Sequence, residues 1–343
     1  MTHSSSASIS GTSALSPPST DVLDDAEDSV NLELRQVAVP VAGHGQRIDR
    51  ALADAVPEFS RSYLQQLIEL GAVQLGGKPV SKASARVKAG ELLTIELRPT
   101  PQSQAFKPEA MTLNIVFEDE YLRVINKPAG LVVHPAPGNW SGTLLNGLLA
   151  RDVQASCLPR AGIVHRLDKD TSGLMVVARQ RQTMDQLVDM IAKRNVSREY
   201  IALVNGAWQG SKTRQIESPV GRDPRNRLRM AVVDLTKNAG KPASTLVTLL
   251  DTGGLFSLVR CKLHTGRTHQ IRVHMADIGH PLVADQTYGG AAAGGLVRQA
   301  LHACLLAFTH PATGVEMVFT EQPPADIQLA IAAIGLRYNA DLR

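Results

Sequence analysis

The segment His165-Arg166-Leu167-Asp168-Lys169-Asp170-Thr171-Ser172-Gly173-Leu174 carries four charged side chains between two apolar stretches. It follows Ile163-Val164 and runs into residues 174–178, an apolar run of the length and type found in buried strands. We therefore expect a polar loop held between two buried strands, a scaffold that fixes side chains well. From residue types alone, Asp168 and Asp170 fit either turn residues that bond their own backbone or a reactive carboxylate in a rigid loop.

Composition sets the broad class of the protein. The chain has 343 residues, of which 43% are hydrophobic and 20% charged, so we expect a globular protein with two or three domains. Cys157, Cys261 and Cys304 lie far apart, which favours reduced thiols and no disulfide framework. The N-terminus lacks a basic region and an apolar run, and no segment approaches the ~18 apolar residues of a membrane span. We expect a cytoplasmic protein with no membrane partner.

Charge is distributed unevenly along the chain. Residues 1–36 hold six acidic residues and one arginine, so this segment carries −5, and because the whole chain carries +4 the rest carries +9. Eight of the first twenty residues are serine. Such a composition buries too little apolar surface to fold, so residues 1–36 are predicted to be a disordered tail. The basic remainder favours a polyanionic partner.

Residues 47–97 have the pattern of a small compact unit. Ser60 is a candidate N-cap for the second of two helices, Gly76-Gly77 marks a hairpin, and residues 92–97 form a closing strand. Basic residues surround these elements and fit either a solvated surface or a nucleic-acid contact: Arg61, Lys78, Lys82, Arg86 and Lys88.

Residues 98–110 contain three prolines and are predicted to be an extended linker before a second domain over residues 111–335. Residues 115–117, 122–128 and 131–135 read as strands of this domain. Lys127, with Pro128, fits a rigid turn or a substrate contact. Further on, Tyr200 lies in a strand pattern, where tyrosine usually packs in a core.

Two later segments are rich in basic and imidazole side chains. Four arginines, among them Arg225 and Arg227, surround Asp223-Pro224 in a predicted loop that fits phosphate contact or plain solvation. In residues 263–274, Gly266 allows a turn and Thr268 is a candidate cap for a helix that turns Ile271 inward. The histidines there lack the i,i+4 spacing of zinc proteases, so no metal site is expected.

Five motifs resemble those of the RluA family of RNA pseudouridine synthases. They are His-Arg-Leu-Asp at 165–168 with Thr-Ser-Gly-Leu at 171–174, Asn-Lys-Pro-Ala-Gly at 126–130, Tyr-x-Ala-x-Val at 200–204, Thr-Gly-Arg-Thr-His-Gln-Ile-Arg at 265–272, and the closing segment 301–311. The unit at 47–97 resembles an S4 RNA-binding domain. The resemblance implies an α+β fold, in which a mixed, largely antiparallel sheet forms the catalytic domain behind a small α/β S4-like domain.

The resemblance also implies roles for individual residues. Asp168 is the expected nucleophile, Arg272 its ion-pair partner, Tyr200 the neighbour of the uracil ring, and Arg166 the residue that enters the space left by an extruded nucleotide. Further substrate contacts are expected from His165, Lys127, Arg267 and Ile271. RNA contacts are expected from Arg61, Lys78, Lys82, Arg225 and Arg227.

The implied activity is the isomerisation of uridine to pseudouridine in a hairpin loop of 23S ribosomal RNA, in support of large-subunit assembly, by a monomer. No atom is gained, so no cofactor is expected. Attack by Asp168 at ribose C1′ or at uracil C6 both remain open, as do another 23S site and a tRNA site.

Two other protein classes stay open at this point. Residues 168–172 nearly match the Asp-x-Asp-x-Thr/Val motif of haloacid-dehalogenase-type phosphatases, but Ser172 replaces the last residue and the preceding segment is not a strongly apolar strand. The basic charge alone would also fit a non-catalytic RNA-binding protein.

Overall fold

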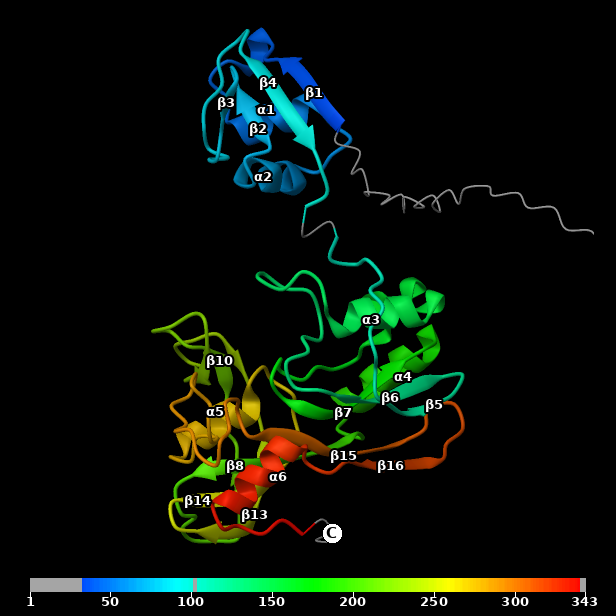
Figure 1. The fold of residues 1–343 in the computed structure, drawn as a ribbon, viewed down its shortest axis with the longest axis vertical. Helices are drawn as coiled ribbons and strands as arrows, with labels where there is room; N and C mark the ends of the chain where they lie inside the picture. The colour runs from blue at the N-terminus through cyan, green and yellow to red at the C-terminus, as the bar shows by residue number, and fades with distance from the viewer. Residues whose placement is uncertain (1–32, 101–103, 340–343) are drawn as a thin grey trace, which may run out of the picture. The chain divides into compact units, whose positions relative to one another are not determined.

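The computed structural model describes residues 33–100 and 104–339, which belong to two units, Met1–Thr100 and Pro101–Arg343 (Figure 1). Each unit has its own hydrophobic core. Most of the predicted tail, residues 1–32, lies outside the described residues. No helix of the described ranges is long and apolar enough to cross a membrane.

The first unit packs two helices against a four-stranded antiparallel sheet of order β1-β4-β2-β3. Apolar residues at helical spacing, such as Leu64, Leu67 and Ile68, are fully buried against the sheet. The Ser60 hydroxyl accepts from the Tyr63 amide, which confirms the predicted N-cap. The elements are β1 (Glu33–Ala38), a 3-10 turn (Val41–Gly43), α1 (Ile48–Ala55), α2 (Arg61–Glu69), β2 (Val73–Leu75), β3 (Lys78–Pro79) and β4 (Leu92–Leu97).

One end of the predicted tail was placed wrongly. Residues 33–36 are not disordered but form most of β1, which pairs with β4 from Glu33 opposite Leu97 to Ala38 opposite Leu92. An edge strand is held by backbone hydrogen bonds along one side, so its exposed, charged side chains hide it from a prediction based on composition.

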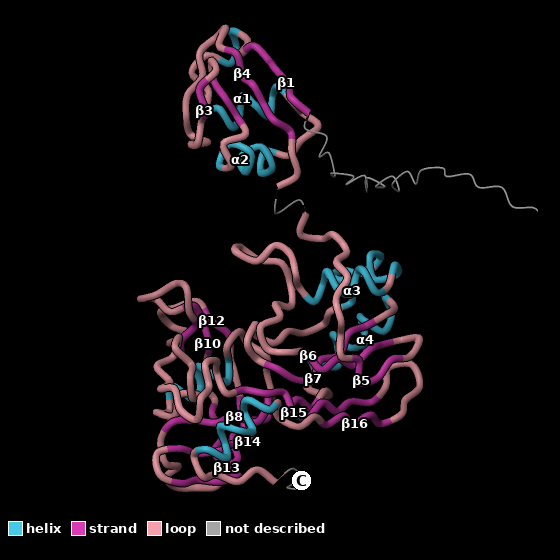
Figure 2. Tube along the Cα trace, viewed as in Figure 1, coloured by secondary structure: helices cyan, strands magenta, loops and turns pink. Residues whose placement is uncertain are grey.

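The second unit is built on a nine-stranded sheet of order β5-β6-β7-β15-β8-β14-β13-β9, with β16 paired to β15. Every pair is antiparallel except β7 with β15. The fold class is therefore the predicted one, α+β with a mixed, largely antiparallel sheet. Figure 2 shows these strands in magenta. Their bounds are β5 (Ile115–Glu118), β6 (Leu122–Lys127), β7 (Ser172–Ala178), β8 (Ser197–Asn205), β9 (Thr213–Ile216), β13 (Thr245–Gly253), β14 (Phe256–Leu263), β15 (Leu301–Thr309) and β16 (Glu316–Thr320).

Helices pack on both faces of this sheet. Residues of β7 alternate between the faces, with Met175 and Val177 in a core shared with α3 (Leu144–Arg151) and α5 (Gln270–Asp277). Leu174 and Val176 join a core on the opposite face with α4 (Arg181–Ala192). Farther along that second face, α6 (Ala325–Ala333) packs on β8 and β14. A separate three-stranded sheet contains β10 (Val220–Arg222), β11 (Met230–Val232) and β12 (Gly240–Lys241).

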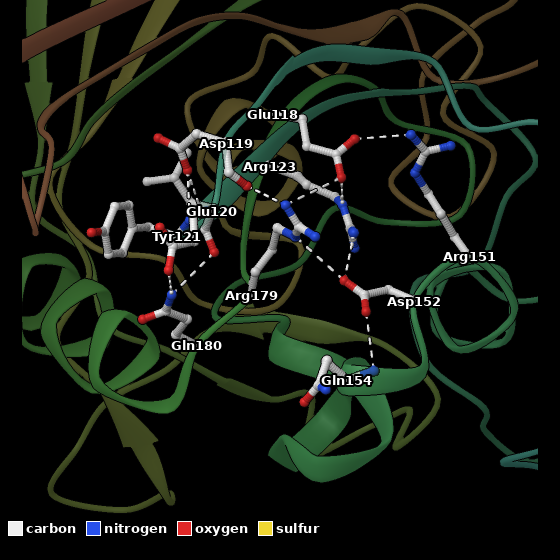
Figure 3. A network of polar contacts seen from close by, with 11 residues as sticks. Glu118, Asp119, Glu120, Tyr121, Arg123, Arg151, Asp152, Gln154, Arg179 and Gln180 are labelled. Carbon is white, nitrogen blue, oxygen red and sulfur yellow. Dashed lines mark hydrogen bonds and ion pairs between the residues drawn. The ribbon is translucent and has the colours of Figure 1, made fainter.

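A polar network ties the strand pair β5–β6 to the 3-10 helix η2 (Val153–Cys157) (Figure 3). Its centre is Arg123, only 3% exposed, whose guanidinium donates to Glu118 and to Asp152, both at 2.6 Å. Arg151 and Arg179 add further ion pairs to the same two carboxylates. The buried cation is thus fully paired, and the network holds the sheet edge to the segment after α3.

Three predicted features differ in the structure. Residues 163–164 form no strand, because Ile163 makes one isolated bridge to Val177 at the end of a 3-10 helix, Pro159–Gly162. Residues 131–135 form none either, since the Val132 and Val133 carbonyls accept from the first amides of α3 instead of from a strand. The predicted linker is described over residues 98–100, which belong to the first unit, and over residues 104–110, which pack on the second unit with Ala105 buried.

Candidate active site

The functional side chains meet at a cleft of about 720 Å³ on the face of the sheet that carries α3 and α5. Its walls are the loop that carries Asp168 (residues 165–171, the Asp168 loop), strand β8 and the segment 263–272 before and into α5. Its charged lining consists of Asp168 and six arginines, and several histidines also line it: the arginines are Arg160, Arg166, Arg194, Arg198, Arg267 and Arg272.

The buried side chain of Lys127 supports the Asp168 loop. This side chain is fully buried, and its ammonium donates to the carbonyls of Pro128, Leu131 and Lys169 at 2.8 to 2.9 Å. Burial lowers the pKa of Lys127 to about 7, against the opposing effect of nearby carboxylates. Lys127 is not among the residues that line the cleft and supports the loop, and a contact with the substrate stays a prediction.

The far end of the loop is fixed by the parallel pair of strands. Ser172 and His302 share a hydrogen bond of 3.0 Å between Oγ and Nδ1. At Gly173, φ is +116°, and a Cβ there would lie 2.3 Å from the Ala303 carbonyl oxygen, so only glycine fits. The Asp168 loop thus enters β7 in one defined conformation.

Asp168 faces a buried pair of opposite charges. Nη1 of Arg272 donates to its carboxylate at 3.1 Å, while Nε and Nη2 of Arg272 donate to Asp285 at 2.7 and 2.9 Å. Asp285 is 1% exposed, whereas the Asp168 side chain is 16% exposed and borders the cleft. Burial opposes the charge on Arg272, but hydrogen bonds and charges from Asp285 and Asp168 raise its pKa above the ordinary value.

Two aromatic side chains complete this arrangement. The guanidinium carbon of Arg272 lies 5.0 Å from the ring centre of Tyr288, a cation–π distance. The Tyr288 hydroxyl is 2.9 Å from Nδ1 of His269, whose Nε2 lies 3.9 Å from Asp168. Burial lowers the pKa of His269, which favours the neutral ring. His269, in a left-handed conformation, precedes the first residue of α5, so the predicted cap Thr268 is wrong.

Tyr200 lies on β8 and lines the cleft, although only 5% of it is exposed. Burial raises the pKa of its hydroxyl to about 12, so the ring is a neutral, mostly apolar surface at physiological pH. The residue therefore belongs to the core, as is usual for a strand tyrosine, and also forms part of the cleft wall.

The remaining predicted substrate contacts differ in exposure. Arg166 is exposed in the cleft, and Arg267 lines it while donating to the Pro242 carbonyl at 3.1 Å. Ile271 is 4% exposed and belongs to the core beside the cleft. Burial lowers the pKa of His165 to about 3, and its ring accepts from the Val176 amide at 3.1 Å, so it braces the loop.

The predicted RNA contacts lie outside the cleft. Arg61 donates to the buried carboxylate of Asp49 at 2.7 Å, with half of its side chain exposed. Lys78 and Lys82 are exposed in the same unit. In the second unit, Arg225 and Arg227 are exposed in the loop between β10 and β11.

Sequence reasoning missed Asp285 and Tyr288. Both lie in the stretch Val283-Ala284-Asp285-Gln286-Thr287-Tyr288, which shows no periodicity and belongs to none of the five family motifs. An aspartate just before a tyrosine and a glycine pair reads as turn chemistry. No local signal distinguishes it from a carboxylate that holds an arginine 13 residues earlier.

Comparison with known proteins defines the class. The family model for RNA pseudouridylate synthase matches residues 121–277, and that for the S4 domain matches residues 46–93. Two bacterial relatives are 47% and 41% identical to this chain over 89% and 91% of its length. The chain belongs to the RNA pseudouridylate synthase family and is an isomerase with an N-terminal S4 domain.

Within the family, the chain is similar to two proteins named ribosomal large subunit pseudouridine synthase D. That of Neisseria meningitidis serogroup B is 47% identical over 318 residues, which cover 89% of this chain and 83% of the relative. That of Xanthomonas campestris pv. campestris is 41% identical over 324 residues, 91% and 96% of the two chains. Among solved structures, human RNA pseudouridylate synthase domain containing 1 has a TM-score of 0.51 at 28% identity and covers 63% of this chain and 86% of its own.

Proposed function

We propose that this enzyme converts uridines of 23S ribosomal RNA to pseudouridine, with Asp168 as the nucleophile. The observation that carries the proposal is the lining of the cleft. Among the described residues, Asp168 is its only carboxylate, in a wall that otherwise carries six arginines. Such a wall attracts a polyanion and places one nucleophile against it. The names of the two bacterial relatives support ribosomal RNA as that polyanion.

The reaction needs no external atom. The bond from N1 of uracil to ribose C1′ breaks, C5 bonds to C1′, and the proton on C5 is released while N1 gains one. A carboxylate suits this chemistry because it adds to carbon and later leaves. The Arg272 guanidinium donates to Asp168 at 3.1 Å and so places a positive charge beside the attacking carboxylate. The proposal leaves both attack at C1′ and addition at C6 open.

A paired uridine must first leave its helix. Extrusion of a nucleotide costs a few kcal/mol and is repaid by contacts in the pocket. In our proposal Tyr200 packs against the detached ring while it turns, and the exposed Arg166 fills the vacated space in the RNA. Arg61, Lys78, Lys82, Arg225 and Arg227 are proposed to contact backbone phosphates away from the cleft.

The test is release of tritium from ribosomal RNA whose uridines carry tritium at C5. The parent enzyme is expected to release tritium without magnesium or nucleotide. Asp168→Asn is expected to lower the rate below about one thousandth, because the amide is a poor nucleophile. Asp170→Asn, the same change two residues on, is the matched control and should keep most of the activity.

A parent enzyme that is inactive on ribosomal RNA, or an Asp168→Asn variant with the parental rate, would contradict the proposal. Chemistry that blocks reverse transcription at pseudouridine then identifies the modified uridines. If only transfer RNA is modified, the proposed activity is correct but its substrate is transfer RNA and not ribosomal RNA.

A further inference from the structure

Arg198 is a buried arginine that faces the cleft. It lies on β8 two residues before Tyr200, so the two side chains share a face of the strand. Arg198 is 6% exposed and lines the cleft. Within the described ranges its Nε is buried without a hydrogen-bond partner, and no carboxylate pairs with its guanidinium.

The other buried arginines of the described residues have carboxylate partners. Arg123 is paired with Glu118 and Asp152, and Arg272 with Asp168 and Asp285. The carboxylate next to Arg198 in sequence, Glu199, points to the opposite face and lies near Lys262 and Arg260. Because a buried charge without a partner is costly, folded proteins rarely keep one unless a ligand completes the site.

The wall opposite Arg198 leaves room for the guanidinium. A Cβ on Gly266 would lie 2.8 Å from Nη1 of Arg198, so the absence of a side chain at this position accommodates the group. Gly266 lies in the segment between β14 and α5, which also lines the cleft. The guanidinium is thus held between two walls of the cleft rather than extended into solvent.

We infer that Arg198 binds a backbone phosphate of the RNA strand at the target uridine. The inference rests on the proposed function, since it takes RNA as the substrate. A phosphate supplies the missing negative charge and presents several oxygens to the fork of a guanidinium. A uracil carbonyl offers an acceptor but no charge, and would leave the buried cation uncompensated.

The experiment is phosphate-ethylation interference on a large-subunit ribosomal RNA fragment, with Asp168→Asn as the binding-competent background. Ethylation of one phosphate close to the target uridine should block binding when Arg198 is present and have no effect in Arg198→Gln. Arg198→Gln should bind the unmodified RNA about tenfold or more weakly, as for loss of a charged hydrogen bond. The slope of log affinity against log salt should fall by about 0.7, as for one phosphate of a single strand.

Two variants keep the test independent of folding. Gly266→Ala leaves Arg198 in place but crowds its guanidinium, and should weaken the same interference signal. Arg181→Gln removes an exposed arginine of α4 and should leave the interference pattern unchanged. The melting temperature of Arg198→Gln should equal or exceed that of the parent, since a buried unpaired charge is removed.

An ethylation pattern that is identical with and without Arg198 would overturn the inference, as would a signal that responds to changes in the base and not in the phosphate. A parent that releases tritium but shows either result refutes only the role of Arg198. A parent that releases no tritium from ribosomal RNA refutes the proposed function itself.

Discussion

Asp285 orients the arginine that faces the nucleophile. It accepts two hydrogen bonds from Arg272 and leaves only Nη1 of that guanidinium for Asp168. We expect Asp285→Asn to lower kcat about 10- to 100-fold with little change in KM, because the charge that holds Arg272 in position is lost. Initial rates of tritium release under multiple turnover, measured over a range of RNA concentrations, give both constants.

The control for this prediction is Asp251→Asn, which alters a partly exposed aspartate of β13. Asp285→Asn and Arg272→Lys should also be non-additive, since both act on one ion pair. A rise in KM at unchanged kcat would show that Asp285 acts on RNA binding instead.

At the residue scale, the sequence does not identify a side chain's interaction partner when that partner is distant in the chain. Asp168 and Arg272 are 104 residues apart, and only the resemblance to a family brought them together before the structure did. Asp285 lies outside all five family motifs. Lys127 lies in a motif, but three backbone carbonyls enclose its ammonium, and a sequence does not show which carbonyls a lysine meets.

The side chain of Asn146 on α3 holds the segment 104–110 through two hydrogen bonds. Nδ2 of Asn146, itself fully buried, donates to the carbonyls of Ala105 and Lys107 at 3.0 and 2.8 Å. Asn146→Ala should destabilise the second unit by roughly 2 kcal/mol, because the carbonyls of the buried Ala105 and of Lys107 lose their donor. Hydrogen exchange of residues 104–110 should accelerate in the variant.

Glu109→Gln serves as the control, because it keeps an acceptor for the Gly142 amide at the neighbouring contact. Unchanged exchange and unchanged denaturant midpoint in Asn146→Ala would mean that the segment is held by other contacts.

At the element scale, periodic segments were predicted well and irregular ones were not. The Ser60-capped helix and the Gly76-Gly77 hairpin have strong local signals, and both are present. Residues 131–135 look like a strand because they are apolar, yet their carbonyls meet the start of α3. Strand β1 does not look like a strand in the sequence because its side chains are charged, yet it forms one by pairing with β4.

Acid should weaken the first unit through one buried aspartate. Asp49 is fully buried and accepts from Arg47, Gln65 and Arg61, and these hydrogen bonds lower its pKa in the folded protein despite burial. An acid whose pKa is depressed by folding stabilises the protein above its unfolded pKa, and that stability is lost as pH falls. The first unit should therefore weaken below about pH 4.

Hydrogen exchange of α1 and α2 in the full chain, followed from pH 6 to pH 3, measures this effect. Asp49→Asn should reduce protection at neutral pH and flatten the pH dependence. Equal pH dependence in parent and variant would assign acid sensitivity to other carboxylates.

The parallel pairing of β7 with β15 has a consequence for biosynthesis. Ser172 and His302, which meet across that pair, are 130 residues apart, so the ribosome must extrude most of the catalytic unit before this contact forms. Every described strand of the first unit lies within residues 33–97, so the sheet that these strands form is complete much earlier. Nascent chains therefore pass through a stage in which the first unit has folded while the Asp168 loop still lacks its support, and catalytic competence arrives only near the end of translation.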